Sequence, residues 1–121
     1  MISTPGPKEV ALAWMDAFNQ KDLDRLLGLY DDNAEHYSPK LKVRHPETDG
    51  WIKGKKALRD WWRDAFDRLP TLHYNLVRLT PAEDRVFMEY VRQVAGEEDL
   101  YVGEMLELRH GLIIKSSVFH R

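Results

Sequence analysis

Hydrophobic residues recur at helical spacing in three segments of the chain. The first stripe consists of Val10, Trp14, Ala17 and Phe18. Pro7 predicts the start of this helix, because its missing N–H costs nothing in a first helical turn. A second, short helix is predicted over residues 23–30, with Asp22 as its N-cap. The third runs through residues 54–69 and ends before Pro70, which cannot continue a helix.

Beyond this proline the hydrophobic period changes from helical to alternating. Four runs rich in β-branched and aromatic residues have the length of strands: 71–79, 84–94, 99–108 and 112–120. Turn signals separate them, at Thr80-Pro81, Gly96-Glu97-Glu98 and Arg109-His110-Gly111. Such short links predict an antiparallel meander.

The remaining segment lies between the second and third helices. Residues 31–37 indicate one more strand, and residues 38–54 form a long connection of a kind that is more often functional or mobile than accidental. This order of elements predicts an α+β fold, in which a curved antiparallel sheet wraps around three helices from the N-terminal half and encloses a cone-shaped cavity. We expect a flexible tail at residues 1–6 and a single domain over residues 7–121.

The composition narrows the class of protein. The chain has 121 residues, of which 43% are hydrophobic and 31% charged, a balance typical of a globular domain. Its 18 basic and 20 acidic residues leave a net charge of -2, which argues against nucleic-acid binding driven by charge. The absence of cysteine excludes disulfides and thiolate metal sites. No signal segment or membrane span is visible, so a cytoplasmic protein without a membrane partner is expected.

Alternation along the strands indicates which side chains face the cavity. One face of the second run carries Val86, Met88, Tyr90, Arg92 and Val94, and one face of the third carries Val102, Glu104, Leu106 and Leu108. Because a buried charge needs a partner, we expect Arg92 to pair with Glu104, either as a structural ion pair or as a pair that orients a ligand. The substitution Glu104→Gln would then destabilise the fold. If Arg92 points elsewhere, Glu104 would remain protonated in its apolar setting.

Other polar residues are also candidates for a site. Glu35, His36 and Tyr37 lie together on the strand after the second helix, where alternation lets only one of His36 and Tyr37 enter the cavity. His120 follows apolar residues on the last strand, as either a structural residue or a site residue. Basic residues gather in the long connection and just after it: Lys40, Lys42, Arg44, Lys53, Lys55 and Lys56. They form either a solvated flap or an attractor for an anionic ligand.

The third helix carries adjacent tryptophans, Trp61 and Trp62. Neighbouring helical residues point about 100° apart, so we expect the two to divide between core and cavity. We assign Trp61 to the core and Trp62 to the cavity wall. On the opposite face of the sheet, Phe87 and Val91 form an apolar patch that needs covering.

Three stretches, in this order, carry a resemblance to a known family. They are "AWMDAFNQKDLDRLLGLYDDNAEHYSP", "GWIKGKKALRDWW" and "ELRHGLIIKSSVFH". With the order of elements, they resemble the nuclear transport factor 2-like superfamily, which includes ketosteroid isomerases, scytalone dehydratases and SnoaL-like polyketide cyclases. The resemblance runs from about Lys8 to His120 and implies the cone-shaped fold, although this fold hosts many functions. It also implies a homodimer that pairs through the sheet.

The resemblance also assigns positions to the isomerase site. Those enzymes use a carboxylate base after the second helix, a tyrosine on the first helix and a protonated aspartic acid on a late strand. Here Trp14 falls on the tyrosine position and Glu104 on the aspartic acid position. The base position falls on Tyr37, or on His36 with a shift of one residue. Because Tyr37 cannot act as a carboxylate base, steroid isomerisation is not expected.

Two classes of function follow from these residues. The first is a cofactor-independent isomerase, cyclase, dehydratase or hydrolase that acts on a small apolar molecule. Its catalytic candidates are Tyr37, Glu104, Glu35 and His120, and its ligand-binding candidates are Trp14, Phe18, Trp62, Phe66, Tyr90 and Arg92. The second is a non-catalytic ligand-binding or dimerisation module. No metal or cofactor is expected, because the five histidines lack ligand spacing and no phosphate-binding motif occurs.

Overall fold

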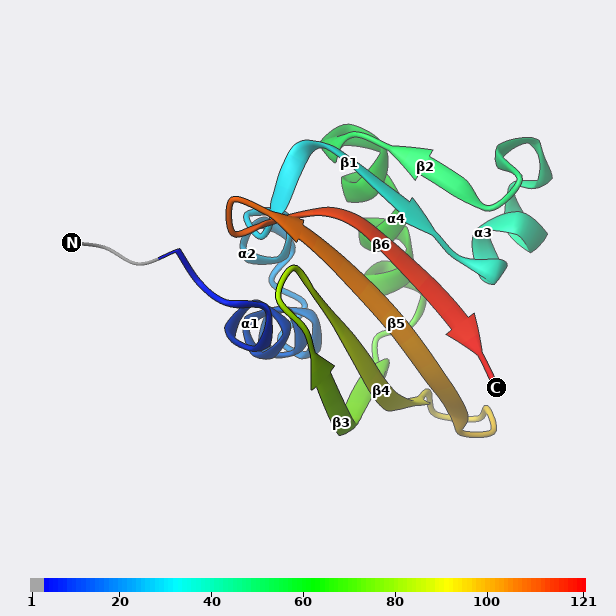
Figure 1. Cartoon of the computed structure of the whole chain (residues 1–121). Coiled ribbons are helices and arrows are strands. Elements are labelled where there is room, and N and C mark those ends of the chain that lie inside the picture. The colour runs from blue at the N-terminus through cyan, green and yellow to red at the C-terminus, as the bar shows by residue number, and fades with distance from the viewer. Residues whose placement is uncertain (1–3) are drawn as a thin grey trace.

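The computed structural model describes residues 4–121, and Figure 1 labels its elements. The helices are α1 (Pro7–Asn19), α2 (Leu23–Leu27), α3 (Pro39–Arg44) and α4 (Lys55–Arg68), with a short 3-10 helix η1 (Pro46–Thr48). The strands are β1 (Tyr30–Tyr37), β2 (Trp51–Lys53), β3 (His73–Pro81), β4 (Arg85–Gln93), β5 (Leu100–Arg109) and β6 (Leu112–His120). The predicted tail falls partly on residues 1–3, which lie outside the described residues. No helix within residues 4–121 has both the length and the apolar character to cross a membrane.

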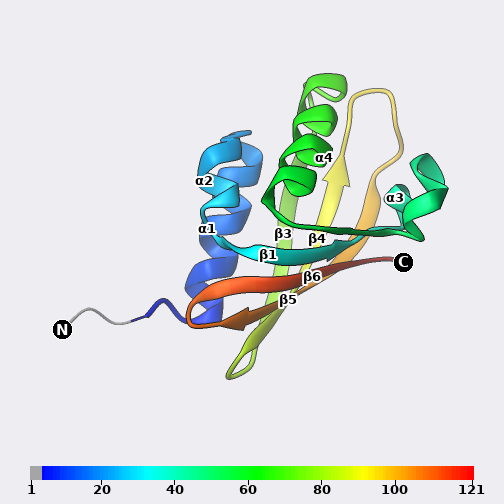
Figure 2. The ribbon, with the colours of Figure 1, turned by 90° about the horizontal axis from the view of Figure 1, so that it is seen from above.

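The six strands form one sheet in the order β2-β1-β6-β5-β4-β3. The predicted meander is confirmed, since β3 to β6 pair with their neighbours in antiparallel fashion. The sheet is nevertheless mixed, because β1 runs parallel to β6. The sheet curves around α1 and α4 without closing on itself, which confirms the α+β cone (Figure 2).

The predicted helices form close to their predicted limits. Pro7 begins α1, and the Asp22 side chain accepts a hydrogen bond from the Arg25 backbone N–H at the start of α2. The prediction was wrong at Tyr30, which begins β1 instead of ending α2. Leu26, Leu27 and Tyr30 keep helical spacing, but the helix ends at Leu27, with Gly28 as its C-cap, and Tyr30 turns inward as the first strand residue.

The long connection between β1 and α4 is more ordered than the sequence suggested. Ser38 caps α3 by accepting the Lys40 backbone N–H at 3.2 Å, and Leu41 anchors this helix in the interior. A tight turn follows, with Asp49 and Gly50 at positive φ, and it leads into β2. Since β2 pairs with β1, the segment that joins these strands is held at both ends. This segment contains α3, which lies beyond the C-terminal end of β1 (Figure 1).

Alternation assigned the faces of β4 and β5 correctly. Every predicted inward residue of the two strands is buried, from Val86 to Val94 and from Val102 to Leu108. On the outer face, Phe87 lies over Gly103, where a Cβ atom would collide with its ring. Phe119 lies beside Phe87, with 6.4 Å between the two ring centroids, and is 53% exposed.

We propose that this outer face pairs with a second copy of the chain, because its aromatic side chains are otherwise left in water. Such an interface would bury on the order of 1,200–2,000 Å² in total. Light scattering at micromolar concentration should then give a dimeric mass, and Phe119→Lys should shift the protein to monomers. Leu12→Lys is the control, since Leu12 is also exposed but lies on α1. A monomeric wild type would contradict the proposal.

Candidate functional site

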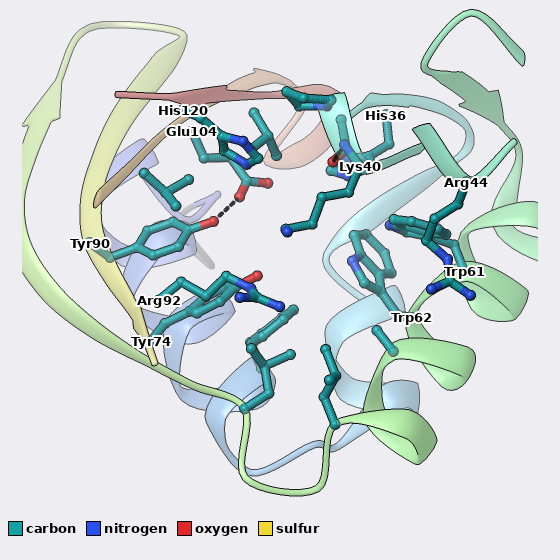
Figure 3. Close-up of a pocket in the computed structure, with 18 of the residues that line it drawn as sticks. His36, Lys40, Arg44, Trp61, Trp62, Tyr74, Tyr90, Arg92, Glu104 and His120 are labelled. Atoms are coloured by element: carbon teal, nitrogen blue, oxygen red, sulfur yellow. Dashed lines mark hydrogen bonds between the residues drawn. The ribbon is translucent and has the colours of Figure 1, made fainter. Parts of the chain in front are cut away.

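A cavity of about 440 Å³ lies between the inner face of the sheet and helices α1, α3 and α4 (Figure 3). This volume suits a small organic molecule. Aromatic side chains form most of its wall: Trp14, Phe18, Trp61, Trp62, Tyr74 and Tyr90. Ionisable side chains also line it: His36, Lys40, Arg44, Arg68, Arg92, Glu97, Glu104 and His120.

Stacked rings build one wall from α1 across β3 to β4. Trp14 stacks on Phe18 at 5.1 Å, Phe18 on Tyr74 at 4.1 Å, and Tyr74 on Tyr90 at 4.1 Å between ring centroids. Phe66, predicted to bind ligand, does not line the cavity; it packs edge-on against Phe18 at 5.0 Å. Because the stacked rings cover one another's faces, the wall presents mainly ring edges to a ligand, with Phe66 supporting it from behind.

Glu104 is the most unusual group in the cavity. The residue is 1% exposed, and its Oε1 atom accepts a hydrogen bond from the Tyr90 hydroxyl at 2.7 Å. Its Oε2 atom is buried and has no hydrogen-bond partner anywhere in residues 4–121. Burial raises the pKa of the Glu104 carboxyl to about 7, although the Tyr90 hydrogen bond acts in the opposite direction. Both protonation states are therefore accessible near neutral pH.

The predicted pairing of Arg92 with Glu104 was wrong. Arg92 is buried on the expected face but donates to Glu97, in the β4–β5 connection, at 2.8 Å. Met88 is the residue opposite Glu104 across the strands, so Arg92 lies four positions further along β4, roughly 13 Å away in the strand direction. Alternation predicted the shared face correctly, but it contains no information on this separation.

The structure also corrects the prediction for β1. His36 is 2% exposed and lines the cavity, whereas Glu35 and Tyr37 are half-exposed on the opposite face. The ring of Tyr37 packs on Trp51, at 5.1 Å. The family-based count was therefore one residue out. Parity could not be carried from the start of the strand, because the pairing of β1 with β6 is irregular between Tyr30 and Glu35.

A buried chain of hydrogen bonds leads from Trp14 to the Nδ1 atom of His36. The Trp14 indole N–H donates to the Tyr30 hydroxyl at 3.0 Å, which donates to Ser116 Oγ at 3.1 Å. Ser116 Oγ lies 2.6 Å from His36 Nδ1. Because an indole can only donate, Tyr30 passes its own proton to Ser116, and the hydroxyl proton of Ser116 is then available to His36 Nδ1. In the tautomer in which Nδ1 accepts this proton, the neutral ring carries its own proton on Nε2.

Burial lowers the pKa of His36 to about 3, so the ring stays neutral at physiological pH. Sequence reasoning missed Ser116 and the role of Tyr30 in this chain. Trp14 lines the cavity with its ring, as predicted, but its indole N–H is engaged by Tyr30 and is not free for a ligand.

The adjacent tryptophans do not divide as predicted. Trp62 is 4% exposed, packs near Tyr30 and His36, and also lines the cavity, so it is both core and wall. Trp61 is only partly buried and reaches the cavity near its rim, which corrects its assignment to the core. The buried stripe of α4 consists of Leu58, Trp62 and Phe66, at intervals of four residues.

The mouth of the cavity is basic. His120 lines it from the end of β6, and partial burial together with Lys40 and Arg92 lowers the pKa of its imidazole. Of the basic residues in the long connection, Lys40 and Arg44 also line the cavity. Within residues 4–121, no three His, Asp or Glu side chains gather in a way that would hold a metal ion.

The family profile of the SnoaL-like domain matches residues 11–116. No functionally curated protein matches the chain. A SnoaL-like protein of unknown function from Burkholderia thailandensis has 25% sequence identity and a TM-score of 0.86. The alignment covers 95% of this chain and 93% of that one.

Two further structures share the fold at lower identity. A candidate ketosteroid isomerase from Kribbella flavida is 18% identical, with a TM-score of 0.74 over 93% of this chain and 75% of its own. A candidate polyketide cyclase from Sinorhizobium meliloti is 14% identical, with a TM-score of 0.77 over 91% and 93%. The profile match covers most of the chain, and the chain belongs to the SnoaL-like family of the nuclear transport factor 2-like superfamily.

Proposed function

We propose that the protein binds a small, largely apolar molecule in the cavity and transfers a proton on it through Glu104, without a cofactor. The observation that carries this proposal is the buried Oε2 atom of Glu104, which has no hydrogen-bond partner among the described residues. The carboxyl to which it belongs has a pKa of about 7. A buried acceptor without a partner is costly, so its retention favours a role toward a ligand. A carboxyl with a pKa near neutrality is suited to both accept and return a proton.

The chemistry would use two side chains of the cavity, Glu104 and His36. Ionised Glu104 takes a proton from a carbon next to a ligand carbonyl, and the electron pair of that C–H bond moves toward the carbonyl oxygen. The Nε2–H group of neutral His36 is the available donor for the negative charge that develops there. Protonated Glu104 then returns the proton to another ligand atom, which completes an isomerisation or permits ring closure.

Other predicted catalytic residues take different places in this proposal. Glu35 and Tyr37 lie on the face of β1 away from the cavity and have no part in the reaction. His120 contributes to the mouth. A purely binding function remains the alternative, and the stacked wall of Trp14 and Phe18 would serve both functions equally. The polar cavity floor at Glu104 is what favours catalysis.

A substrate-independent test is the ring opening of nitrobenzisoxazole, in which a base removes one C–H proton while the N–O bond breaks to give a cyanophenolate. The wild type should accelerate this reaction with a rate that rises through about pH 7 as Glu104 ionises. Glu104→Gln should lower the rate about a hundredfold. Glu35→Gln is the matched control and should retain it. Equal rates for the wild type and the Glu104 variant would contradict the proposal.

The pH dependence of stability provides a second prediction. The pKa of Glu104 is 4.5 in the unfolded chain and about 7 in the folded protein, so below pH 4.5 both states hold the proton. As the pH rises toward 7, the unfolded chain ionises first. Burial of the carboxyl therefore lowers the free energy of unfolding, by about 3 kcal/mol once the pH is above the folded value.

Glu104→Gln does not titrate, so in urea unfolding it should gain about 3 kcal/mol relative to wild type between pH 4.5 and about pH 8. This differs from the destabilisation expected for a pair with Arg92. A variant less stable than wild type by the same amount at both pH values would show that Glu104 is ionised and paired.

A further inference from the structure

Four cations surround the mouth of the cavity and have no part in the proton transfer. This cationic rim consists of Lys40, Arg44, Arg68 and Arg92. Arg44 and Arg68 share Asp64, at 3.5 and 2.8 Å, and all three are partly in water. Arg92 pairs with Glu97. Lys40 differs from the others, because none of the ion pairs within residues 4–121 includes it.

Lys40 lies at the start of α3, and its side chain extends into the cavity rather than toward solvent (Figure 3). Partial burial lowers the pKa of its ammonium, and the like charges of Arg92 and Arg68 act in the same direction, against one acid, Glu97. A desolvated ammonium beside like charges is stabilised when an anion binds next to it. Without a ligand, the Lys40 ammonium at the mouth therefore has no ion-pair partner among the described residues.

The charges around Lys40 also limit the kind of anion. Lys40 and Arg92 carry two positive charges and Glu97 cancels one, so these three side chains match a single negative charge. The other two cations of the rim, Arg44 and Arg68, share Asp64 and add one more positive charge. The chain as a whole has a net charge of -2, so this positive mouth is a local feature that would attract anions to the cavity. The same anion would be repelled by ionised Glu104 at the floor, which keeps the charged end of a ligand at the mouth.

We propose that the ligand is an amphipathic organic monoanion, with an aromatic body against the ring edges of the stacked wall and a carboxylate on Lys40 and Arg92. This proposal rests on the proposed function and names the class of its substrate. It orients the molecule, since the carboxylate stays at the rim and the opposite end reaches Glu104. An aromatic acid therefore binds better than its neutral analogue of the same shape.

The test compares naphthylacetic acid with naphthylacetamide, which differ in charge and little in shape. Calorimetric titration of the wild type at low salt should show the acid binding about tenfold tighter or more, as expected for hydrogen bonds to a charged group. Lys40→Gln should remove about that factor for the acid and change the amide less than twofold. Lys42→Gln is the matched control, because Lys42 lies on the same helix, pairs with Asp49 and does not line the cavity.

The outcomes separate the two proposals. Equal affinity of acid and amide for the wild type would overturn the monoanion proposal while leaving an apolar binding cavity intact. Equal losses in Lys40→Gln and Lys42→Gln would also overturn it, since a general charge effect would then explain the preference. Failure of both compounds to bind would contradict the monoanion proposal and ligand binding in the cavity together. Loss of nitrobenzisoxazole activity in Glu104→Gln tests proton transfer independently of either affinity.

Discussion

The hydrogen bond between Tyr90 and Glu104 joins two adjacent strands, β4 and β5. It holds the Glu104 carboxyl, the group to which we assign the proton transfer, in the cavity. Both residues point inward because β4 and β5 alternate, and the bond is 2.7 Å long. It satisfies Oε1 and leaves Oε2 buried without a partner. Tyr90 is itself held by stacking on Tyr74, which stacks on Phe18, so the position of the carboxyl depends on the packing of α1 against the sheet. A carboxyl in this setting costs stability when ionised, and the fold retains it at the cavity floor.

A second polar cluster, on β1 and β6, reaches the cavity at His36. A chain of hydrogen bonds runs from Trp14 through Tyr30 and Ser116 to His36, and burial keeps the His36 ring neutral. The cavity therefore has one group, Glu104, that can change its protonation state near neutral pH, and a neutral imidazole that does not. Such an arrangement separates proton transfer from charge stabilisation. The basic mouth adds a third chemical environment, at the only part of the cavity wall where cations gather among the described residues.

Periodicity predicted α1, α2, α4, the meander and the inward position of Glu104, because it reports directly on faces and on element type, and the resemblance identified the superfamily. No comparable signal in the sequence indicated α3 and β2. Sequence reasoning also failed where a three-dimensional distance decides. Arg92 and Glu104 share a face but lie four positions apart along the strands, and only the register shows that Glu97 is the nearer acid. The choice of Tyr37 over His36 failed because a count carried across a family is sensitive to a single residue, and β1 is irregular between Tyr30 and Glu35. Ser116 carried no signal beyond its inward parity, since its role depends on β1 lying beside β6.

The proposed proton transfer requires Glu104 to change its protonation state near neutral pH inside the folded protein. Carbon-13 NMR of the side-chain carboxyl carbons, with Glu104→Gln to assign the Glu104 signal, measures this directly. We expect a titration of Glu104 with a midpoint at about pH 7. A midpoint at or below the ordinary value of 4.5 would show that the carboxylate is ionised and paired in the folded state, and would rule out Glu104 as the group that exchanges a proton.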